Sequence, residues 1–529
     1  MKQEEMEAGL YRIVNIEQMH RLEQEADQSG LSFAQMMQNA GRGVGEFIYH
    51  RWKEGDFHST LGLVGPGNNG GDTLVALTYL QEKGWVTRAY LLKDRDAQDE
   101  LMQTYLQAGG TLCYHSQDEH FKQLDAAIQQ ADILLDGILG TGIQLPLRGV
   151  VKQVLSHLKE RDKLPFIVAV DCPSGVDCES GEVDDAVLHA DWTICIAAMK
   201  QGLLRFPAFE YVGAIGIVDI ALPDDLGSWE GIAEYCVEQT AVRSILPKRP
   251  MQAHKGTFGT AVLFAGSKNY PGAAYLAAQA AYRIGTGLVQ IATIPSVQYM
   301  LAGALPEATW ALLDEKQDGF AWNASKDLEN ILLRATSLLI GPGWGSGRDT
   351  LAFYQDLLYV LKDVDRWKYH GVVLDADGLN LLCEIPDFEH VLPVNAILTP
   401  HPGEMARLTG KPIHEIQSDR ISVVRKAAMD WKCVVVLKGA LTVIAEPEGQ
   451  VAEIPIATAA LATAGSGDVL AGMLCGLLAQ GMNPFDAACG AAWMHARAGV
   501  IAEKCMGHAA CVLAGDVLRA IPDVMNELK

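Results

Sequence analysis

The chain has 529 residues, of which 49% are hydrophobic and 20% charged, and this is typical of a globular protein with two domains. Its formal net charge of −23 excludes a nucleic acid or an anionic membrane as the expected partner, because those surfaces repel an acidic protein. None of the 11 cysteines forms a Cys-x-x-Cys pair, so we expect reduced thiols rather than a zinc site or a disulfide framework.

The N-terminal segment is charged and lacks the apolar core of a signal peptide, and the first ~50 residues look helical. The apolar run at 461–481 is rich in glycine and alanine and starts with an aspartate-containing turn, so we expect a core helix rather than a membrane span. These features predict a cytoplasmic enzyme.

Short apolar runs alternate with helical patterns from residue 59 onward, as in "STLGLV" (59–64) followed by "DTLVALTYLQEKG" (72–84). Such alternation predicts parallel α/β sheets whose functional loops follow the carboxyl ends of the strands. Two prolines and a basic cluster interrupt the pattern between residues 237 and 259. We therefore predict an N-terminal domain at 1–237 and a C-terminal domain at 238–529.

The stretch "GPGNNGGD" (65–72) follows a predicted strand and opens a predicted helix. Its glycines allow positive φ angles and a close approach of the backbone to a phosphate or a ribose. Asn68 and Asn69 supply carbonyl oxygens, which suit a hard or weakly bound cation. A tight strand-to-helix turn with no ligand is the alternative.

Two further strand ends carry aspartates, Asp136 in "LLDGILGTG" and Asp171 in "VAVDCPSG". The carboxyl ends of parallel strands meet at one edge of a sheet, so we expect Asp136, Asp171 and Asn69 to converge, with Ser174 close by. A lone aspartate at a strand end is more often a helix cap, but three such strand ends favour a site.

The stretch "AGSGD" (464–468) precedes an apolar helix and exposes backbone N–H groups that attract an anion. Asp468 would repel that anion unless the carboxylate takes a proton from a hydroxyl that attacks a phosphoryl group held by the amides. The turn therefore indicates phosphoryl transfer, with a simple capping aspartate as the alternative.

The order GNNGGD, D-x-x-x-GTG-x-x-x-PLRG and D-x-PSG-x-D resembles the epimerase domain of the NAD(P)HX repair proteins over residues 10–230. That resemblance implies a Rossmann-like doubly wound fold that interconverts the R and S epimers of nicotinamide cofactor hydrated at C6. It implies Asp171 as acid/base and a potassium ion on Asn69, Asp136 and Ser174. Lys200 is a candidate electrostatic helper, or else an ordinary snorkelling lysine. The implied cofactor contacts are Asn68, Asn69, Gly70, Gly71, Asp72, Gly140, Thr141, Gly142, Ile143, Gln144, Leu145, Pro146 and Asp171.

The second half contains "GSKNYPGAAY", "GPGWGSG", "LDADGLN", "LTPHPGEMARLTG" and "VVLKGALTVI" in order. With the GSGD turn, these segments resemble the ADP-dependent NAD(P)HX dehydratase domain over residues 240–525, which implies a ribokinase-like α/β fold. The resemblance makes Asp468 the base that lets the C6 hydroxyl be phosphorylated and then eliminated. It implies Mg²⁺ with ADP. The implied nucleotide contacts are Lys438, Gly439, Ala440, Leu441, Thr442 and Gly467, and the hydrated-cofactor contacts are Ala273, Gly343, His401 and Asp468.

Three residues depart from the family patterns. Thr73 and Leu441 stand where glycine is usual, and Gly378 stands where alanine is usual. A β-branched Thr73 would narrow the N-terminal cofactor pocket, and Leu441 would crowd the nucleotide.

The leading prediction is a bifunctional enzyme that repairs hydrated NAD(P)H. Its expected substrates are small molecules, NAD(P)HX and ADP, and we expect the protein to form a homo-oligomer. One alternative is a ribokinase-like small-molecule kinase with a nucleotide-binding N-terminal module. The other is a non-catalytic nucleotide-binding protein, at least for the N-terminal half.

Overall fold

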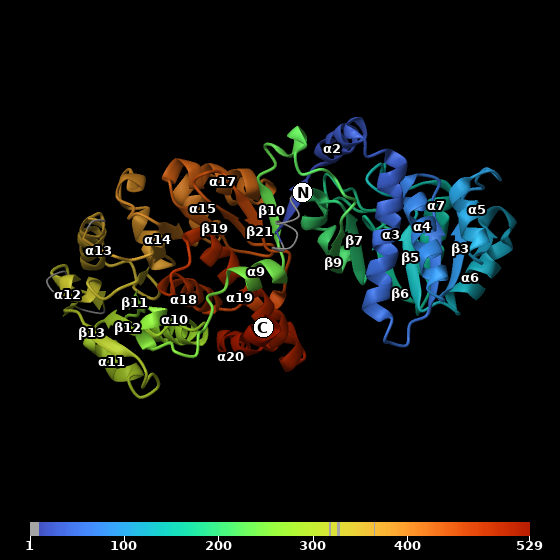
Figure 1. The fold of residues 1–529 in the computed structure, drawn as a ribbon. Helices are drawn as coiled ribbons and strands as arrows, with labels where there is room; N and C mark the ends of the chain where they lie inside the picture. Colours follow the sequence, from blue (N-terminus) through green and yellow to red (C-terminus); the bar gives the residue numbers. More distant parts are fainter. Residues whose placement is uncertain (1–9, 317–318, 325–327, 364–365) are drawn as a thin grey trace. The chain divides into compact units, whose positions relative to one another are not determined.

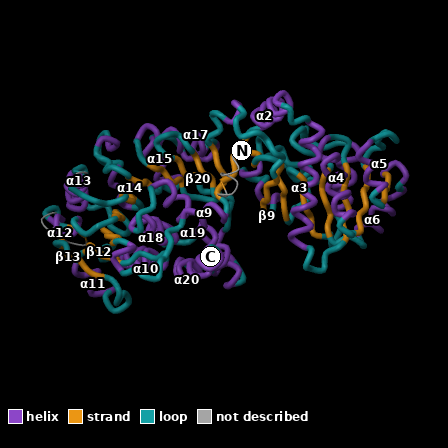
Figure 2. Tube along the Cα trace, viewed as in Figure 1, coloured by secondary structure: helices purple, strands orange, loops and turns teal. Residues whose placement is uncertain are grey.

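The computed structural model describes residues 10–316, 319–324, 328–363 and 366–529 (Figure 1). The chain divides into two compact units, the first containing Tyr11–Ile232 and the second containing Ala233–Lys529. Both units combine sheets with covering helices, which confirms the predicted α/β class (Figure 2). No helix among the described residues is long and apolar enough to cross a membrane.

The first unit is built on a parallel sheet in the order β4-β3-β2-β5-β6-β7-β9. The chain runs outward from β2 to β4 and then returns to β5 on the other side of β2, so the strand order reverses between β2 and β5. This is the doubly wound pattern, and ligands bind at such a reversal. The strands are β2 (Ser59–Val64), β3 (Val86–Leu91), β4 (Thr111–Tyr114), β5 (Ile133–Gly137), β6 (Phe166–Val170), β7 (Trp192–Ile196) and β9 (Ala214–Val218).

Helices cover both faces of this sheet. Alternate residues of β2 show why: Leu61 and Leu63 pack with the core under α6 and α7, whereas Val64 packs with the core under α3 and α4. Successive side chains of a strand point to opposite faces of the sheet, so a strand with apolar residues at consecutive positions is buried on both faces. The helices are α2 (Ile16–Ser29), α3 (Phe33–Trp52), α4 (Asn68–Glu82), α5 (Glu100–Gln107), α6 (Lys122–Ile128), α7 (Gly149–Lys159) and α8 (Phe209–Val212).

The second unit has a sheet in the order β13-β12-β11-β16-β17-β18-β19-β20-β21-β10. It is parallel from β13 to β19, and its order reverses between β11 and β16. The strands are β10 (Glu234–Val237), β11 (Thr260–Phe264), β12 (Leu288–Thr293), β13 (Thr309–Leu312), β16 (Ser337–Ile340), β17 (Gly371–Leu374), β18 (Ala396–Leu398), β19 (Val434–Leu437), β20 (Val443–Ala445) and β21 (Val451–Glu453), and a separate hairpin pairs β14 (Glu315–Lys316) with β15 (Gly319–Phe320).

The helix that follows the GSGD turn is a core element, as predicted. In α18, every residue from Val469 to Ala479 is buried. A Cβ added to Gly472 would lie 2.2 Å from the carbonyl oxygen of Ala277 in α10, so only glycine allows these helices to pack so closely. The helices of this unit are α9 (Gln239–Ile245), α10 (Pro271–Arg283), α11 (Pro295–Leu301), α12 (Leu328–Leu332), α13 (Arg348–Leu361), α14 (Asp377–Leu382), α15 (Pro402–Thr409), α16 (Ile413–Ser418), α17 (Arg420–Trp431), α18 (Ser466–Ala479), α19 (Pro484–Met506) and α20 (Ala514–Glu527).

Three local expectations were wrong. Helix α4 begins at Asn68 rather than at Asp72, so the two asparagines lie in its first turn and not in the middle of a loop. Within the largely helical start of the chain, β1 (Leu10–Val14) is a strand, and it pairs with β8 (Met199–Lys200). The run after β19 forms antiparallel pairs of β20 with β19 and with β21, where only parallel strands were predicted.

Candidate active sites

The first candidate site lies where the strand order of the first unit reverses. A Cβ on Gly65, after β2, would stand 1.8 Å from the carbonyl oxygen of Ile138, after β5. A Cβ on Gly70 would stand 2.0 Å from the carbonyl oxygen of Gly65. These glycines therefore serve the close approach of two loops and a helix start, and this contact fixes the edge of the site.

The residues expected to hold a cation come together beside these loops. The buried Asp136 carboxylate accepts hydrogen bonds from Ser174 N at 2.8 Å and from Ser174 Oγ at 2.6 Å. Asn69 Nδ2 donates to the carbonyl oxygens of Leu139 at 2.8 Å and Val170 at 2.9 Å. Burial raises the pKa of Asp136, although its hydrogen bonds from Ser174 oppose that shift. Carboxylate, hydroxyl, amide and carbonyl oxygens are suitable ligands for a hard cation.

Asp171 forms a buried ion pair with Lys200. Its carboxylate accepts from Lys200 Nζ and from Ile196 N at 3.0 Å, and Lys200 Nζ also donates to Ile196 O at 2.7 Å. Burial disfavours the charged lysine, but Asp171 outweighs it and raises the pKa of Lys200. Lys200 is 1% exposed, so it is not a snorkelling surface lysine. Asp171 has φ +65°, an uncommon conformation for a residue other than glycine, and such strain clusters at functional sites.

A cavity of 1280 Å³ opens over this pair. Of the cofactor contacts expected from the sequence, those that line it are Asn68, Asn69, Asp72, Gly140, Thr141, Gly142 and Asp171, together with Lys200. The remaining expected contacts, which are not among the lining residues, are Gly70, Gly71, Ile143, Gln144, Leu145 and Pro146. Gly71 instead accommodates a side chain, because a Cβ there would lie 2.7 Å from Met37 Sδ.

Two of the other carboxyl groups that line the cavity, those of Asp72 and Glu23, have raised pKa values. Burial, followed by repulsion from Asp171 and Glu23, raises the pKa of Asp72 well above its ordinary value. Burial also raises the pKa of Glu23 in α2, although Lys200 and His20 oppose that shift. Sequence reasoning missed Glu23, because no motif surrounds it and only tertiary packing brings α2 to the cavity.

Thr73 does not narrow this cavity. Its hydroxyl donates to Asn69 O at 2.7 Å, and the side chain is fully buried. A Cβ on Gly137 would meet the Thr73 hydroxyl oxygen at 1.7 Å, so the threonine fills space that the glycine of β5 leaves open. The expected narrowing was wrong, since the side chain points to the sheet.

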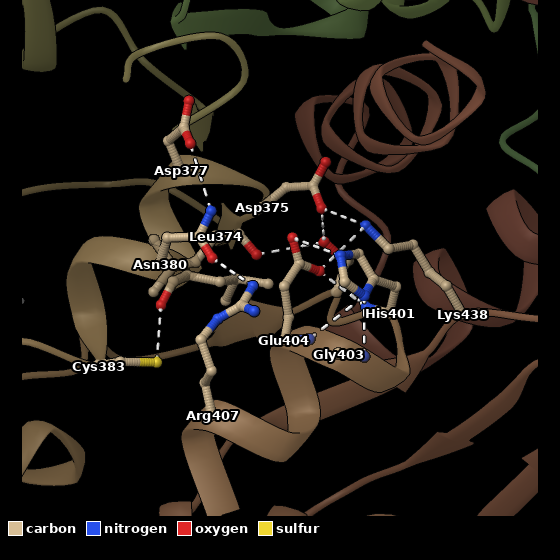
Figure 3. Close-up of polar contacts among 12 residues, drawn as sticks. Leu374, Asp375, Asp377, Asn380, Cys383, His401, Gly403, Glu404, Arg407 and Lys438 are labelled. Atoms are coloured by element: carbon tan, nitrogen blue, oxygen red, sulfur yellow. Dashed lines mark hydrogen bonds and ion pairs between the residues drawn. The ribbon is translucent and has the colours of Figure 1, made fainter. Parts of the chain in front are cut away.

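The second candidate site lies at the carboxyl ends of β17, β18 and β19. Lys438, just after β19, donates to Asp375 Oδ1 at 2.6 Å, and Nζ lies 3.8 Å from Glu404 Oε2 (Figure 3). Thr399 Oγ1 donates to the same Asp375 oxygen at 2.7 Å. Burial opposes the lysine's charge, but these two carboxylates raise the pKa of Lys438.

His401 and Glu404 form a reciprocal cap at the start of α15. His401 Nδ1 accepts from Gly403 N at 2.9 Å and from Glu404 N at 3.2 Å, while His401 N donates to Glu404 Oε2 at 2.8 Å (Figure 3). Burial and the positive charge of Lys438 lower the pKa of His401. Burial raises the pKa of Glu404 to about 6. The imidazole therefore stays neutral near pH 7, and its Nε2 lies 3.5 Å from Glu404 Oε1.

Asp468 lies in the first turn of α18, beside this ion pair. Burial, then repulsion from Asp375, raises the pKa of Asp468 to about 7. A Cβ on Gly467 would lie 3.6 Å from Lys438 Nζ, so the lysine stands next to the amides of the turn. The helix N-terminus and the ammonium group thus place positive charge beside a carboxyl that titrates near neutrality.

The other expected contacts of the second unit fall into two groups. Gly343 and Ala273 are neighbours, because a Cβ on Gly343 would lie 2.9 Å from that of Ala273. Lys438 begins the turn after β19, in which Gly439 and Ala440 are exposed and Thr442 Oγ1 donates to Gly439 O at 3.0 Å. Leu441 adopts φ +55° in this turn with its side chain buried, which explains why glycine suits the position.

Sequence reasoning gave no role to Asp375 or Asp377. Asp375 pairs with Lys438, and Asp377 Oδ2 accepts from Gly345 N at 2.7 Å, so both acids organise the loops of the site. The signal was available, because "LDAD" puts an aspartate directly after an apolar strand, as in the first unit.

Comparison with known proteins matches both units. A family described as NAD(P)H-hydrate dehydratase matches residues 261–523, and a family described as YjeF-related protein N-terminus matches residues 33–202. The bifunctional NAD(P)H-hydrate repair enzyme Nnr of Moorella thermoacetica is 35% identical over 504 residues, covering 93% of this chain and 92% of the relative. The enzyme of the same name from Escherichia coli K12 is 32% identical over 511 residues, covering 95% and 91%.

A solved structure is also similar to part of the chain. The ADP/ATP-dependent NAD(P)H-hydrate dehydratase of Bacillus subtilis, co-crystallised with ATP and Mg²⁺, is 33% identical with a TM-score of 0.47. It covers 55% of this chain and 98% of its own.

Proposed function

The chain belongs to the family of bifunctional NAD(P)H-hydrate repair enzymes, and we propose that its domains at 1–237 and 238–529 carry the two steps of that repair. The first domain interconverts the R and S epimers of hydrated NAD(P)H, and the second dehydrates the S form with ADP. Hydration yields both epimers, so full recovery needs both steps. The family membership favours this function over the small-molecule kinase and the non-catalytic nucleotide-binding protein.

In the first domain, Asp171 is the proposed acid/base at C6 of the hydrated ring. Lys200 holds its carboxylate in one position through the ion pair, and Ile196 N holds the same oxygen. A fixed carboxylate can take a proton from a water molecule that adds to C6. Asn69, Asp136 and Ser174 fit a potassium ion, because they offer an amide oxygen, a carboxylate and a hydroxyl, and Ser174 Oγ lies 2.6 Å from the buried Asp136 carboxylate. When bound, that ion supplies a positive charge that balances Asp136.

In the second domain, Asp468 is the proposed base for the C6 hydroxyl. Asp468 removes the hydroxyl proton, the oxygen attacks the terminal phosphorus of ADP, and AMP leaves. Phosphate then departs from C6 with the electrons of the C–O bond, and it accepts the proton that C5 loses as the dihydropyridine is restored. A pKa of about 7 suits this task, because a base works best when it titrates near the working pH.

The phosphoryl group is proposed to lie between the turn at Gly467 and Lys438. The residues Lys438 to Thr442 would contact the adenylate, and Ala273, Gly343 and His401 would contact the hydrated cofactor. Mg²⁺ bound with ADP supplies charge that offsets the phosphates. Lys438 contributes a point charge at the same place, and its fixed position beside Asp375 limits the reorganisation that the transition state needs.

The observation that carries the proposal is the position of Asp468 at a helix N-terminus beside Lys438, together with its pKa of about 7. The test incubates the purified full chain with a mixture of R and S NADHX, ADP and potassium, and follows the absorbance of the restored dihydropyridine. Full recovery with release of AMP supports both steps. Recovery of the S fraction alone would contradict the epimerase, and no recovery with ADP or ATP would contradict the dehydratase.

We further propose that the protein is a cytoplasmic homo-oligomer that binds neither nucleic acid nor membranes. The net charge of −23 supports the second part, because acidic surfaces repel polyanions. Size-exclusion chromatography with light scattering tests the oligomeric state.

A further inference from the structure

Helix α2 contributes to the first site although it lies outside both family matches, which begin at residues 33 and 261. Met19, His20 and Glu23 line the 1280 Å³ cavity, and their spacing places them on one face of the helix. His20 Nδ1 lies 3.6 Å from Glu23 Oε2. An ionisable pair on an element outside the matched region thus faces the same cavity as Asp171.

The rest of the unit holds α2 firmly. Asn15 and Gln18 form a capping box at its start, and Leu22 and Ala26 are fully buried. On another face, the Glu25 carboxylate accepts hydrogen bonds from Gly227 N at 2.7 Å and Ser228 N at 2.8 Å. The position of Glu23 is therefore fixed by packing and by hydrogen bonds on both sides of the helix.

The charged surroundings of Glu23 come from several elements. Lys200 in β8 and Asp171 after β6 are close enough to affect its pKa, and His20 lies beside it in α2. Asp72 in α4 completes the set, since Glu23 itself contributes to the raised pKa of Asp72. Burial is the largest effect on Glu23, and it favours a protonated carboxyl beside a cavity in which Asp171 is tied to Lys200.

We propose that Glu23 is the second acid/base of the epimerisation, acting on the face of the ring opposite to Asp171; this rests on the epimerase function proposed above. Inversion at C6 requires hydroxyl to leave from one face and water to add to the other, so one group must give a proton and another must take one. Two carboxyl groups on different elements of one cavity can divide that work.

The step balances without a further reactant. The C6–O bond breaks with its electron pair moving to oxygen, which takes the Glu23 proton and leaves as water, while the N1 lone pair forms the N1–C6 double bond. Water then adds to the opposite face, the double bond returns its electrons to N1, and Asp171 takes the released proton. Both carboxyls regain their starting states by exchange with solvent, to which the Glu23 side chain is 31% exposed. The reverse reaction exchanges the two roles.

The test uses the full chain and pure R-NADHX without ADP, and separates R and S by chromatography. Glu23→Gln is expected to lower kcat for epimerisation by about 100-fold or more with KM changed by less than about 3-fold, as for loss of a general acid. Glu23→Asp should retain part of the activity, since it keeps an ionisable group. Glu17→Gln is the matched control, because Glu17 lies on the same helix and its side chain is 79% exposed.

Dehydration of S-NADHX with ADP reports on the second unit and should stay unchanged in all three variants. Epimerisation by Glu23→Gln at the rate of Glu17→Gln would overturn the role of Glu23, and so would a rise in KM with kcat preserved. If the unmodified chain fails to interconvert the epimers, the epimerase function itself is refuted and this role falls with it. Activity in the unmodified chain separates the two failures.

Discussion

Both units place a lysine–aspartate pair at the carboxyl edge of a parallel sheet, yet they leave their candidate bases in different electrostatic settings. In the first unit the candidate base, Asp171, is itself the partner of Lys200. In the second unit Lys438 pairs with Asp375 and Glu404, and Asp468 stands beside that pair with a pKa raised to about 7.

The difference shows that the same edge of the same fold class can serve two kinds of proton transfer. A carboxylate tied to a buried lysine is held in position, and removing it strands a charge. A buried carboxylate with no such tie changes its protonation near pH 7, and removing it relieves a cost. The two aspartates should therefore respond to the same substitution in opposite ways.

The largest expected effect is on the chemistry of the second unit. Asp468→Asn should lower kcat for dehydration of S-NADHX by about 1000-fold or more, because the C6 hydroxyl loses its base. Nucleotide binding, measured by calorimetry with ADP, should persist, and epimerisation should be unchanged. Turnover within about 10-fold of the original enzyme would refute the role of Asp468.

The next effect concerns the tied aspartate. Asp171→Asn should lower epimerisation by about 100-fold or more and should reduce the free energy of unfolding by about 3–5 kcal/mol, because Lys200 is left buried and unpaired. Epimer separation and thermal unfolding measure the two effects.

The double variant Asp171→Asn/Lys200→Met is the control for this effect. It removes the stranded charge, so stability should return while activity stays low. If Asp171→Asn alone were as stable as the original chain, the ion pair between Asp171 and Lys200 would not contribute to stability.

The opposite response is expected for stability in the second unit. Asp468 has a folded-state pKa above its unfolded value, so its contribution to stability is present below pH 4 and is lost as pH rises through about 7. Asp468→Asn should therefore raise the free energy of unfolding by about 2–4 kcal/mol at pH 8. The gain should vanish as pH falls to about 4. Calorimetric scans across that range measure it, and equal stability at pH 8 would contradict the untied setting of Asp468.

The smallest effect tests the departure at Thr73. Thr73→Gly should reduce the free energy of unfolding by about 1–2 kcal/mol, because it removes a buried side chain and places glycine in a helix. Epimerisation should change by less than about 3-fold, since Thr73 packs on Gly137 outside the cavity. A marked gain in activity would show that the threonine restricts the site.

Much of this arrangement follows from local sequence. Apolar strands that end in aspartate or glycine predicted the parallel sheets, the contact of Ser174 with Asp136, the common cavity of Asn69 and Asp171, and the buried helix after GSGD. Each of these depends on a strand and the loop directly after it, where the direction of the chain fixes the position of the side chain. The contacts that the site residues make with the hydrated cofactor and with the nucleotide remain predictions.

The missed features depend on contacts that are distant in sequence. Glu23 lines the cavity only because α2 packs against segments of the unit that are distant in sequence, and the hydrophobic periodicity of α2 does not show which segments these are. Thr73 was misjudged because the space it fills belongs to Gly137 of another strand. The start of α4 at Asn68 was missed because two glycines lower the helix propensity of its first turn, and close packing overrides that preference.

The contact between α10 and α18 has a consequence for the precision of catalysis. Gly472 lies one turn after Asp468 and leaves no room for even a methyl group against Ala277. The position of the Asp468 carboxylate therefore depends on the packing of Gly472 against Ala277, which lies outside the substrate site. Any side chain at position 472 would push α18 away from α10 and displace Asp468, which lies in the first turn of α18. The accuracy with which the catalytic base is positioned thus depends on a glycine that takes no part in the chemistry.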